Sequence, residues 1–223
     1  YSTNDGGVAY TDNDAGPVRT GASAACGPGN GVVRWTTIEE GLGSTQFYTG
    51  AVSASASLWL GGAQDNGTLL QSPFSAGNSF TEIFGGDGAS VAIDPRNDRV
   101  LYVSYQNVNI HRSVDGGSTW VEARTPPAFR AGDSYGRAVR TVFWLCAGHA
   151  DEPGRWYAGA SPQGLFRSDD HGDTWAPVDG WNDHPNWGTW AEWPDVEGTP
   201  DGSLLHSVMV DSRDCNHLYI GLS

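Results

Sequence analysis

Two eight-residue stretches of the chain follow the same pattern, Ser-x-Asp-x-Gly-x-Thr-Trp. They span residues 113–120 and 168–175. Asp and Gly favour a tight turn with positive φ, Ser and Thr hydroxyls can bond the amides of such a turn, and Trp can anchor the turn against its sheet. The pattern therefore predicts a repeated unit that contains the same turn each time. We call these two stretches the octet turns.

The sequence before each octet turn extends the repeat. Residues 100–113 align with residues 155–168, and each stretch reads as a strand, a short turn and a second strand. Residues 57–72 match too, although the turn that follows lacks the Asp and has Phe80 in place of Trp. Two further apolar strands, each ending in an Asp-led turn, are found at 90–98 and 207–215. Four short strands per unit predict an all-β fold of four-stranded antiparallel blades.

The octet turns resemble the Asp-box of BNR-repeat β-propellers, a superfamily that includes sialidases, xyloglucanases and sortilin-like receptors. The resemblance implies a β-propeller and predicts the architecture much better than the activity, because propellers have many functions. It also implies a structural role for the motif residues. These are Ser113, Asp115, Gly117, Thr119, Trp120, Ser168, Asp170, Gly172, Thr174 and Trp175.

The order of strands predicts how much of a propeller is present. With strands named A to D from the axis outward, the chain begins in a C strand near 6–11 and ends after a B strand at 217–222. This makes about four blades' worth of strands in a single domain, 1–223. We expect part of a propeller of about six to eight blades, in keeping with a chain that starts at Tyr1. The alternative is a four-bladed ring closed by pairing of 218–222 with 8–11.

Charge and composition limit the classes of partner that the protein is expected to have. The chain has 26 acidic and 12 basic residues, a formal charge of −14, and all its basic residues are Arg. A nucleic-acid partner is not expected, because neutralising phosphates requires a basic face. No apolar run approaches the roughly 20 residues of a membrane span, so no transmembrane segment is predicted.

The cysteines are compatible with secretion, and we expect an extracellular or cell-envelope location. Three are present, Cys26, Cys146 and Cys215, so at most one internal disulfide can form. A bridge between Cys146 and Cys215 is conceivable, and it would require Cα atoms within about 7 Å of each other.

The segment 180–195 contains four tryptophans and lies in a D-to-A crossover between blades. In an antiparallel blade the B–C turns and these crossovers share one face, whereas the octet turns lie on the other. The rings either cap the propeller as a minor core or form a platform on which sugar rings stack. His206 is either a core histidine or part of this site. The candidate ligand-binding residues are Trp181, Trp187, Trp190, Trp193, Arg137 and His206.

The carboxylates of the same face are the candidates for catalysis: Asp65, Asp183, Glu192 and Asp195. Glycoside hydrolysis needs two carboxylates about 5–5.5 Å apart for retention or about 6.5–9.5 Å apart for inversion. The Arg-Ile-Pro signature of sialidases is absent, and no segment matches the catalytic segments of xyloglucanases. Asp65 also precedes Asn-Gly, for which hairpin turn chemistry is a sufficient explanation. We therefore predict a module that binds carbohydrate or protein, with a glycoside hydrolase as the alternative.

No cofactor is predicted. The sequence lacks the nucleophile elbow, the paired-Cys motif, the zinc-protease motif and the phosphate loop. Runs of Asn and Asp near the start, at 4–5 and 12–14, allow a calcium site, but such runs mostly form turns. We assign no metal ligands.

Overall fold

A computed structural model describes residues 2–4, 7–11, 36–37, 45–77, 79–105, 108–133, 135–190 and 203–222. The chain forms two compact units, 1–45 and 46–223. The first contains a three-stranded antiparallel sheet of β1 (Ser2–Asn4), β2 (Gly7–Tyr10) and β3 (Thr36–Thr37). Strand β2 occupies the position predicted for the first C strand, whereas β1 was not predicted.

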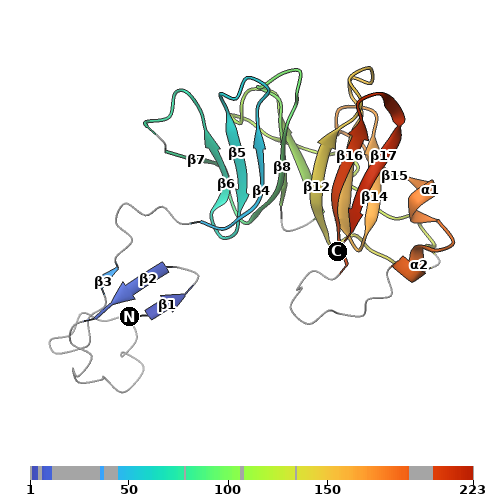
Figure 1. The fold of residues 1–223 in the computed structure, drawn as a ribbon, viewed down its shortest axis with the longest axis horizontal. Coiled ribbons are helices and arrows are strands. Elements are labelled where there is room, and N and C mark those ends of the chain that lie inside the picture. Colours follow the sequence, from blue (N-terminus) through green and yellow to red (C-terminus); the bar gives the residue numbers. More distant parts are fainter. Residues whose placement is uncertain are drawn as a thin grey trace. The chain divides into compact units, whose positions relative to one another are not determined.

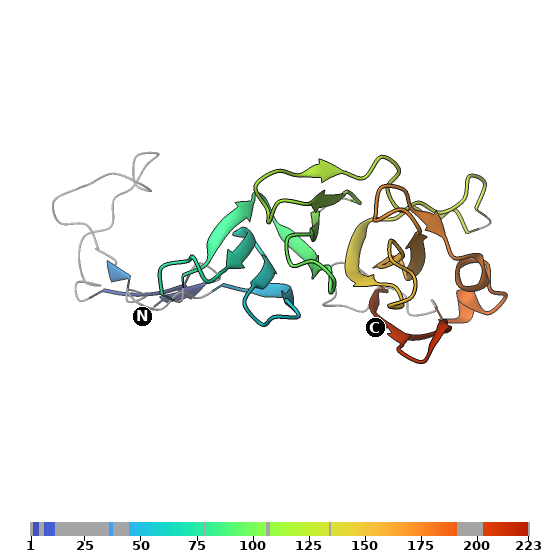
Figure 2. The same cartoon turned by 90° about the horizontal axis from the view of Figure 1, so that it is seen from above.

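The second unit contains three four-stranded antiparallel sheets and one two-stranded sheet (Figures 1 and 2). The first blade comprises β4 (Phe47–Val52), β5 (Trp59–Ala63), β6 (Gly67–Gln71) and β7 (Thr81–Phe84). The second comprises β8 (Gly88–Ile93), β9 (Leu101–Tyr105), β10 (Ile110–Ser113) and β11 (Val121–Glu122). The third comprises β12 (Thr141–Ala147), β13 (Trp156–Ser161), β14 (Gly164–Ser168) and β15 (Ala176–Pro177). A half blade follows, β16 (Leu205–Asp211) and β17 (Asp214–Leu222).

This order confirms the predicted all-β fold of four-stranded antiparallel blades. The strands of each blade pair in chain order, and the first strands β4, β8, β12 and β16 contact one another in succession. They therefore occupy the inner position that the sequence assigned to the A strands.

The blades pack closely because glycine lies where the sheets approach. A Cβ atom on Gly62 in β5 would lie 2.1 Å from the carbonyl oxygen of Ala89 in β8. One on Gly159 in β13 would lie 2.4 Å from the carbonyl oxygen of Leu205 in β16. No side chain fits at either place, so the two glycines set the distance between neighbouring blades.

Apolar residues fill each space between sheets and form three clusters. Leu60, Val91 and Leu101 lie between the first and second blades. Tyr102, Trp156 and Phe166 are completely buried between the second and third. A third cluster, which includes Leu205 and Val208, joins the third blade to the half blade. The core is thus divided among the interfaces between blades.

The octet turns have nearly identical hydrogen bonds. Ser113 Oγ donates to Asp115 Oδ1 (2.8 Å) and accepts from the Gly117 amide (2.8 Å), while Asp115 accepts from the amide (2.9 Å) and hydroxyl (2.7 Å) of Thr119. The second turn repeats these four bonds with Ser168, Asp170, Gly172 and Thr174. Both motif glycines have positive φ, 90° and 83°. The carboxylates therefore hold their own turns.

The two motif tryptophans differ in their partners. Trp175 is buried, and its indole N–H donates to the Gly172 carbonyl of its own turn (3.0 Å). The Trp120 indole instead donates to the carbonyl of Ile83 in the preceding blade (3.0 Å). Trp175 therefore fixes its own turn, whereas Trp120 joins the second blade to the first.

Candidate functional site

The candidate site is the crossover from β15 to β16, which forms two one-turn helices, α1 (Asp179–Asn182) and α2 (Trp187–Trp190) (Figure 1). The sequence predicted an ordered segment here but no helices. Asn182 is buried and fixes the crossover to the third blade. Its Oδ1 accepts from the Leu165 amide (3.0 Å), and its Nδ2 donates to the Leu165 carbonyl (2.7 Å).

The turn between β13 and β14 provides a second anchor. The backbone carbonyl of Gln163 accepts from the indole N–H groups of Trp181 (2.9 Å) and Trp187 (3.3 Å). The crossover therefore lies beside a B–C turn, as the strand order predicts. The octet turns border the A–B turns instead, where the Gly116 amide donates to the Arg99 carbonyl (2.9 Å) and the His171 amide to the Gly154 carbonyl (2.8 Å).

Arg137, one of the residues expected to bind ligand, has a guanidinium that is engaged in contacts within the protein. Its side chain is 5% exposed and forms a salt bridge with Asp133. It also donates to the Asn182 carbonyl (2.8 Å), and its guanidinium lies 4.2–5.0 Å from the ring centroids of Phe129, Tyr135 and Trp187. Arg137, which lies between β11 and β12, therefore links that segment to the β15–β16 crossover, and three aromatic rings pack against its guanidinium.

Trp187 is also part of this internal packing. It is 5% exposed, and its ring contacts both the Arg137 guanidinium (4.2 Å) and the Tyr135 ring (centroids 5.3 Å apart). A buried ring with occupied neighbours presents no surface to a sugar. The ligand-binding role expected for Trp187 therefore has no exposed ring surface to support it.

Trp181 and Trp190 lie closer to solvent and form a stack. Their ring centroids are 4.9 Å apart at an interplanar angle of 25°, and the His184 ring stacks on Trp190 at 4.6 Å and 21°. All three are partly exposed. His184 was not among the residues expected from the sequence, although its position three residues after Trp181 could have suggested it.

Charged groups surround the stack. Asp183 is half-exposed and lies 3.7 Å from an Arg137 nitrogen and 4.0 Å from Arg130 Nε. Arg130 also donates to Asp179, and this hydrogen bond lowers the pKa of the Asp179 carboxyl. Asp183 is therefore an ionisable acceptor beside aromatic rings, with two arginines nearby.

Asp65 and His206 lie on other elements of the fold. Asp65 lies in the β5–β6 turn of the first blade, with φ of 59°, and its amide donates to Asp87 (2.8 Å). His206 is exposed on β16, next to buried Leu205. Glu192, Trp193 and Asp195 lie outside the described residues.

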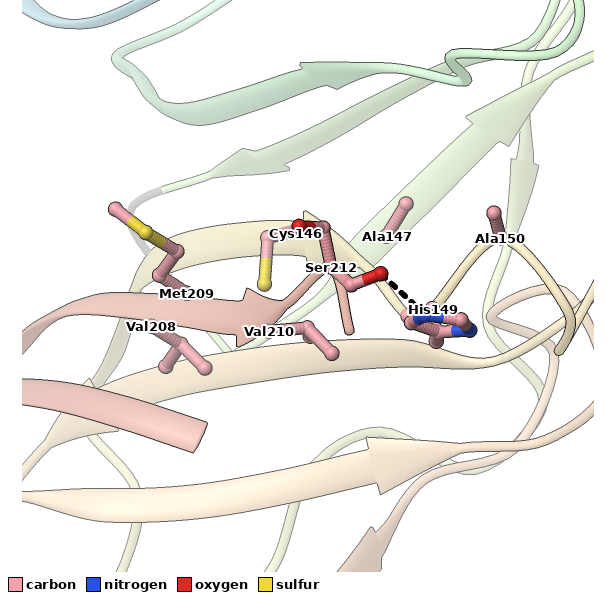
Figure 3. Close-up of a pocket in the computed structure, with 9 residues that line it drawn as sticks. Cys146, Ala147, His149, Ala150, Val208, Met209, Val210 and Ser212 are labelled. Carbon is pink, nitrogen blue, oxygen red and sulfur yellow. Dashed lines mark hydrogen bonds between the residues drawn. The ribbon is translucent and has the colours of Figure 1, made fainter. Parts of the chain in front are cut away.

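A separate apolar pocket of about 310 Å³ lies between β12 and β16. Its lining includes Cys146 and Ala147 from β12 and Val208, Met209 and Val210 from β16, and His149 is hydrogen-bonded to the Ser212 carbonyl (3.0 Å) (Figure 3). Burial raises the pKa of the Cys146 thiol to about 12, so it is not a nucleophile at neutral pH. Cys146 and Cys215 are free thiols, so the conceivable bridge between them is not formed, and Cys26 lies outside the described residues.

The described residues contain no cluster suited to a metal ion and no helix able to cross a membrane. No cluster of three or more His, Cys, Asp or Glu side chains suitable for a metal ion occurs among them. Of the calcium candidates, Asn4 lies in β1, and residues 5 and 12–14 lie outside the described part. Within that part, no helix has the length and apolar character to cross a bilayer.

No family model and no characterised protein matches the sequence. The chain is similar to the solved GH74 xyloglucanase from Xanthomonas campestris, with 20% identity and a TM-score of 0.52, over 79% of this chain and 26% of that one. It is also similar to the GH74 enzyme from Niastella koreensis, with 16% identity and a TM-score of 0.51, over the same shares. YCF48 bound to D1 peptide matches at 14% identity with a TM-score of 0.49, over 78% of this chain and 47% of that chain.

The chain spans about a quarter of the length of the two GH74 enzymes. At this level of identity the similarity shows the fold alone. Together with the order of the blades, it identifies the fold as part of a β-propeller.

Proposed function

We propose that the chain is part of a secreted Asp-box β-propeller domain that binds a carbohydrate through the face formed by the crossover helices. The observation that carries this proposal is the partly exposed stack of Trp181, Trp190 and His184 with Asp183 beside it. Sites of this kind combine aromatic surface with a few polar groups that fix the orientation of the ligand.

The shared hydrogen bonds of the octet turns support the assignment to Asp-box propellers. In both turns one serine and one aspartate make the same four bonds, and those bonds use the residues that define the motif. These bonds support structural roles for Asp115 and Asp170, in keeping with a ligand site on the other face.

The stack offers the chemistry that a sugar requires. Aromatic carbon surface can pack against the C–H face of a pyranose ring, and the Asp183 carboxyl oxygens can accept hydrogen bonds from hydroxyl groups. Arg130 can donate to ring or hydroxyl oxygens from the same side. Trp187 and Arg137 support this surface from below and do not contact ligand.

Binding is favoured over hydrolysis by the distribution of carboxylates. Of the two candidate carboxylates that the structure describes, Asp65 lies in the β5–β6 turn of the first blade, whereas Asp183 lies in the crossover after α1 with two arginines beside it. Xyloglucanase activity is a property of the solved neighbour, and similarity of fold does not transfer it.

The test compares Trp190→Ala with the wild-type chain on a glycan array, followed by calorimetry with any glycan that binds. We expect at least a tenfold loss of affinity for Trp190→Ala. The matched control is Trp59→Ala, which removes a half-exposed tryptophan of β5, outside the crossover, and should leave affinity unchanged. A blank array, or equal affinity for wild type and Trp190→Ala, would contradict carbohydrate binding and leave a protein ligand as the alternative.

A further inference from the structure

The interface between the first and second blades contains a histidine. His111 lies in β10 and pairs across the sheet with Val103 in β9 and with Glu122 in β11. Val103 is buried between these two blades, and side chains of direct cross-strand neighbours share one face of a sheet. The His111 side chain therefore faces the first blade, outside the proposed carbohydrate site.

His111 belongs to a cluster of four rings that links the two blades. Its ring centroid lies 4.8 Å from that of Phe84 in β7, and the Phe84 ring is also close to those of Trp120 (5.3 Å) and Tyr105 (6.4 Å). The Trp120 indole donates to the Ile83 carbonyl of the first blade. The contacts of the imidazole are therefore part of what holds the second blade against the first.

The Nδ1 atom of His111 is buried and has no hydrogen-bond partner. A neutral ring fits this environment, because its single proton can stay on Nε2 and Nδ1 is then an acceptor. An imidazolium carries a proton on both nitrogens, so Nδ1 becomes a buried donor without an acceptor, which is costly. The closed interface therefore favours the neutral ring over the protonated one.

One carboxylate opposes this preference. Burial lowers the pKa of the imidazole, whereas the exposed carboxylate of neighbouring Glu122 raises it by less, so the pKa lies below its usual value. Glu82 in β7 faces away from the second blade, because its cross-strand partner is Leu69 and the adjacent Leu70 packs between the blades. The Tyr105 phenol is the other titratable group of the cluster, and phenols titrate near pH 10.

We propose that His111 is a pH-sensitive contact whose protonation opens the interface between the first and second blades at β7, β10 and β11. Opening exposes Nδ1 to water, which can accept its hydrogen bond, so the open form takes up a proton more readily than the closed form. Histidine in water titrates near pH 6.5, and the closed form titrates at a lower pH. The closed form is therefore most favoured above about pH 6.5 and loses stability as the pH falls from there towards its own lower pKa.

Hydrogen exchange at pH 7.5 and pH 5.0, corrected for the intrinsic rate at each pH, tests this opening. In the wild-type chain we expect peptides covering β7 and β10 to lose protection about three- to tenfold at pH 5.0, whereas peptides covering β13 keep theirs. His111→Phe keeps an aromatic ring without a titratable nitrogen, so its protection should be equal at the two pH values. His206→Phe, at an exposed histidine of β16, should behave like wild type.

Glu122→Gln gives an independent measurement at an exposed residue. Removing this carboxylate takes away a charge that stabilises the imidazolium, so an NMR titration of the His111 ring should have a lower midpoint than in wild type. A wild-type midpoint at or above about 6.5, or no lowering in Glu122→Gln, would overturn the proposal. Unchanged protection of β7 and β10 in wild type at pH 5.0, or an equal loss in folded His111→Phe, would do the same.

Discussion

The Tyr102 hydroxyl donates a hydrogen bond to the His171 carbonyl, 3.0 Å away, and so joins a B strand of the second blade to the octet turn of the third. Gly172, the next residue, lies so close that a Cβ atom there would be 2.9 Å from the Tyr102 ring. The octet turn therefore stabilises the interface between blades as well as its own hairpin.

Tyr102→Phe tests this bond between blades. We expect the free energy of unfolding to fall by about 0.5–1.5 kcal/mol, because the variant removes one hydrogen bond and leaves the His171 carbonyl without that donor. Urea unfolding measures the change. Tyr135→Phe, at a half-exposed tyrosine, should change stability by less than about 0.5 kcal/mol. Equal stabilities of the two variants would contradict the role of the bond.

Gly62→Ala tests the close approach of the first two blades. The added methyl group would meet the Ala89 carbonyl oxygen at 2.1 Å, and backbone must move to admit it. We expect a loss of about 1–3 kcal/mol in the free energy of unfolding, the range for overpacked cores. Gly180→Ala is the control, because no atom lies within 4 Å of a Cβ at that position. A Gly62→Ala protein as stable as the control would show that the interface yields easily.

The pH dependence of stability should reflect the octet carboxylates. Hydrogen bonds from the Thr119 amide and hydroxyl, followed by that from Ser113, lower the pKa of Asp115 from 3.8 to about 2. Because the folded-state pKa is depressed, the contribution of Asp115 is complete above about pH 4 and is lost as the pH falls towards 2. Asp115→Asn should therefore lose less stability than wild type between pH 4 and 2, measured by urea unfolding. Parallel pH profiles would contradict this.

Arg137→Met tests the buried ion pair of Arg137 with Asp133 in the crossover between β11 and β12. Hydrogen bonds from Arg137 lower the pKa of Asp133, so this carboxylate is ionised at neutral pH and would remain buried without its partner. We expect a loss of about 3–5 kcal/mol in the free energy of unfolding, partly recovered in Arg137→Met/Asp133→Leu. Arg140→Met, at an exposed arginine of the same crossover, should have little effect. If Arg137→Met were as stable as Arg140→Met, the ion pair of Arg137 with Asp133 would not contribute to stability as proposed.

The octet turns show which structural features can be predicted from the sequence alone. Their hydrogen bonds join residues two to four positions apart, so the motif already contains both partners of each bond. The same motif does not determine the partner of its tryptophan. Trp175 bonds within its turn, whereas Trp120 reaches Ile83, because the carbonyl within reach depends on the neighbouring blade.

The candidate site shows the opposite case. Sequence identified the crossover and its aromatic residues, but Trp187 and Trp190 look equivalent there. Trp187 is buried because Arg137 and Tyr135 pack against it. These two residues lie about fifty positions earlier in the sequence, in the crossover between β11 and β12. Sequence by itself determined the strand order and the octet turns, because those depend on local geometry and periodicity. Only the tertiary structure decided which rings face solvent, because that depends on side chains that the packed blades bring together.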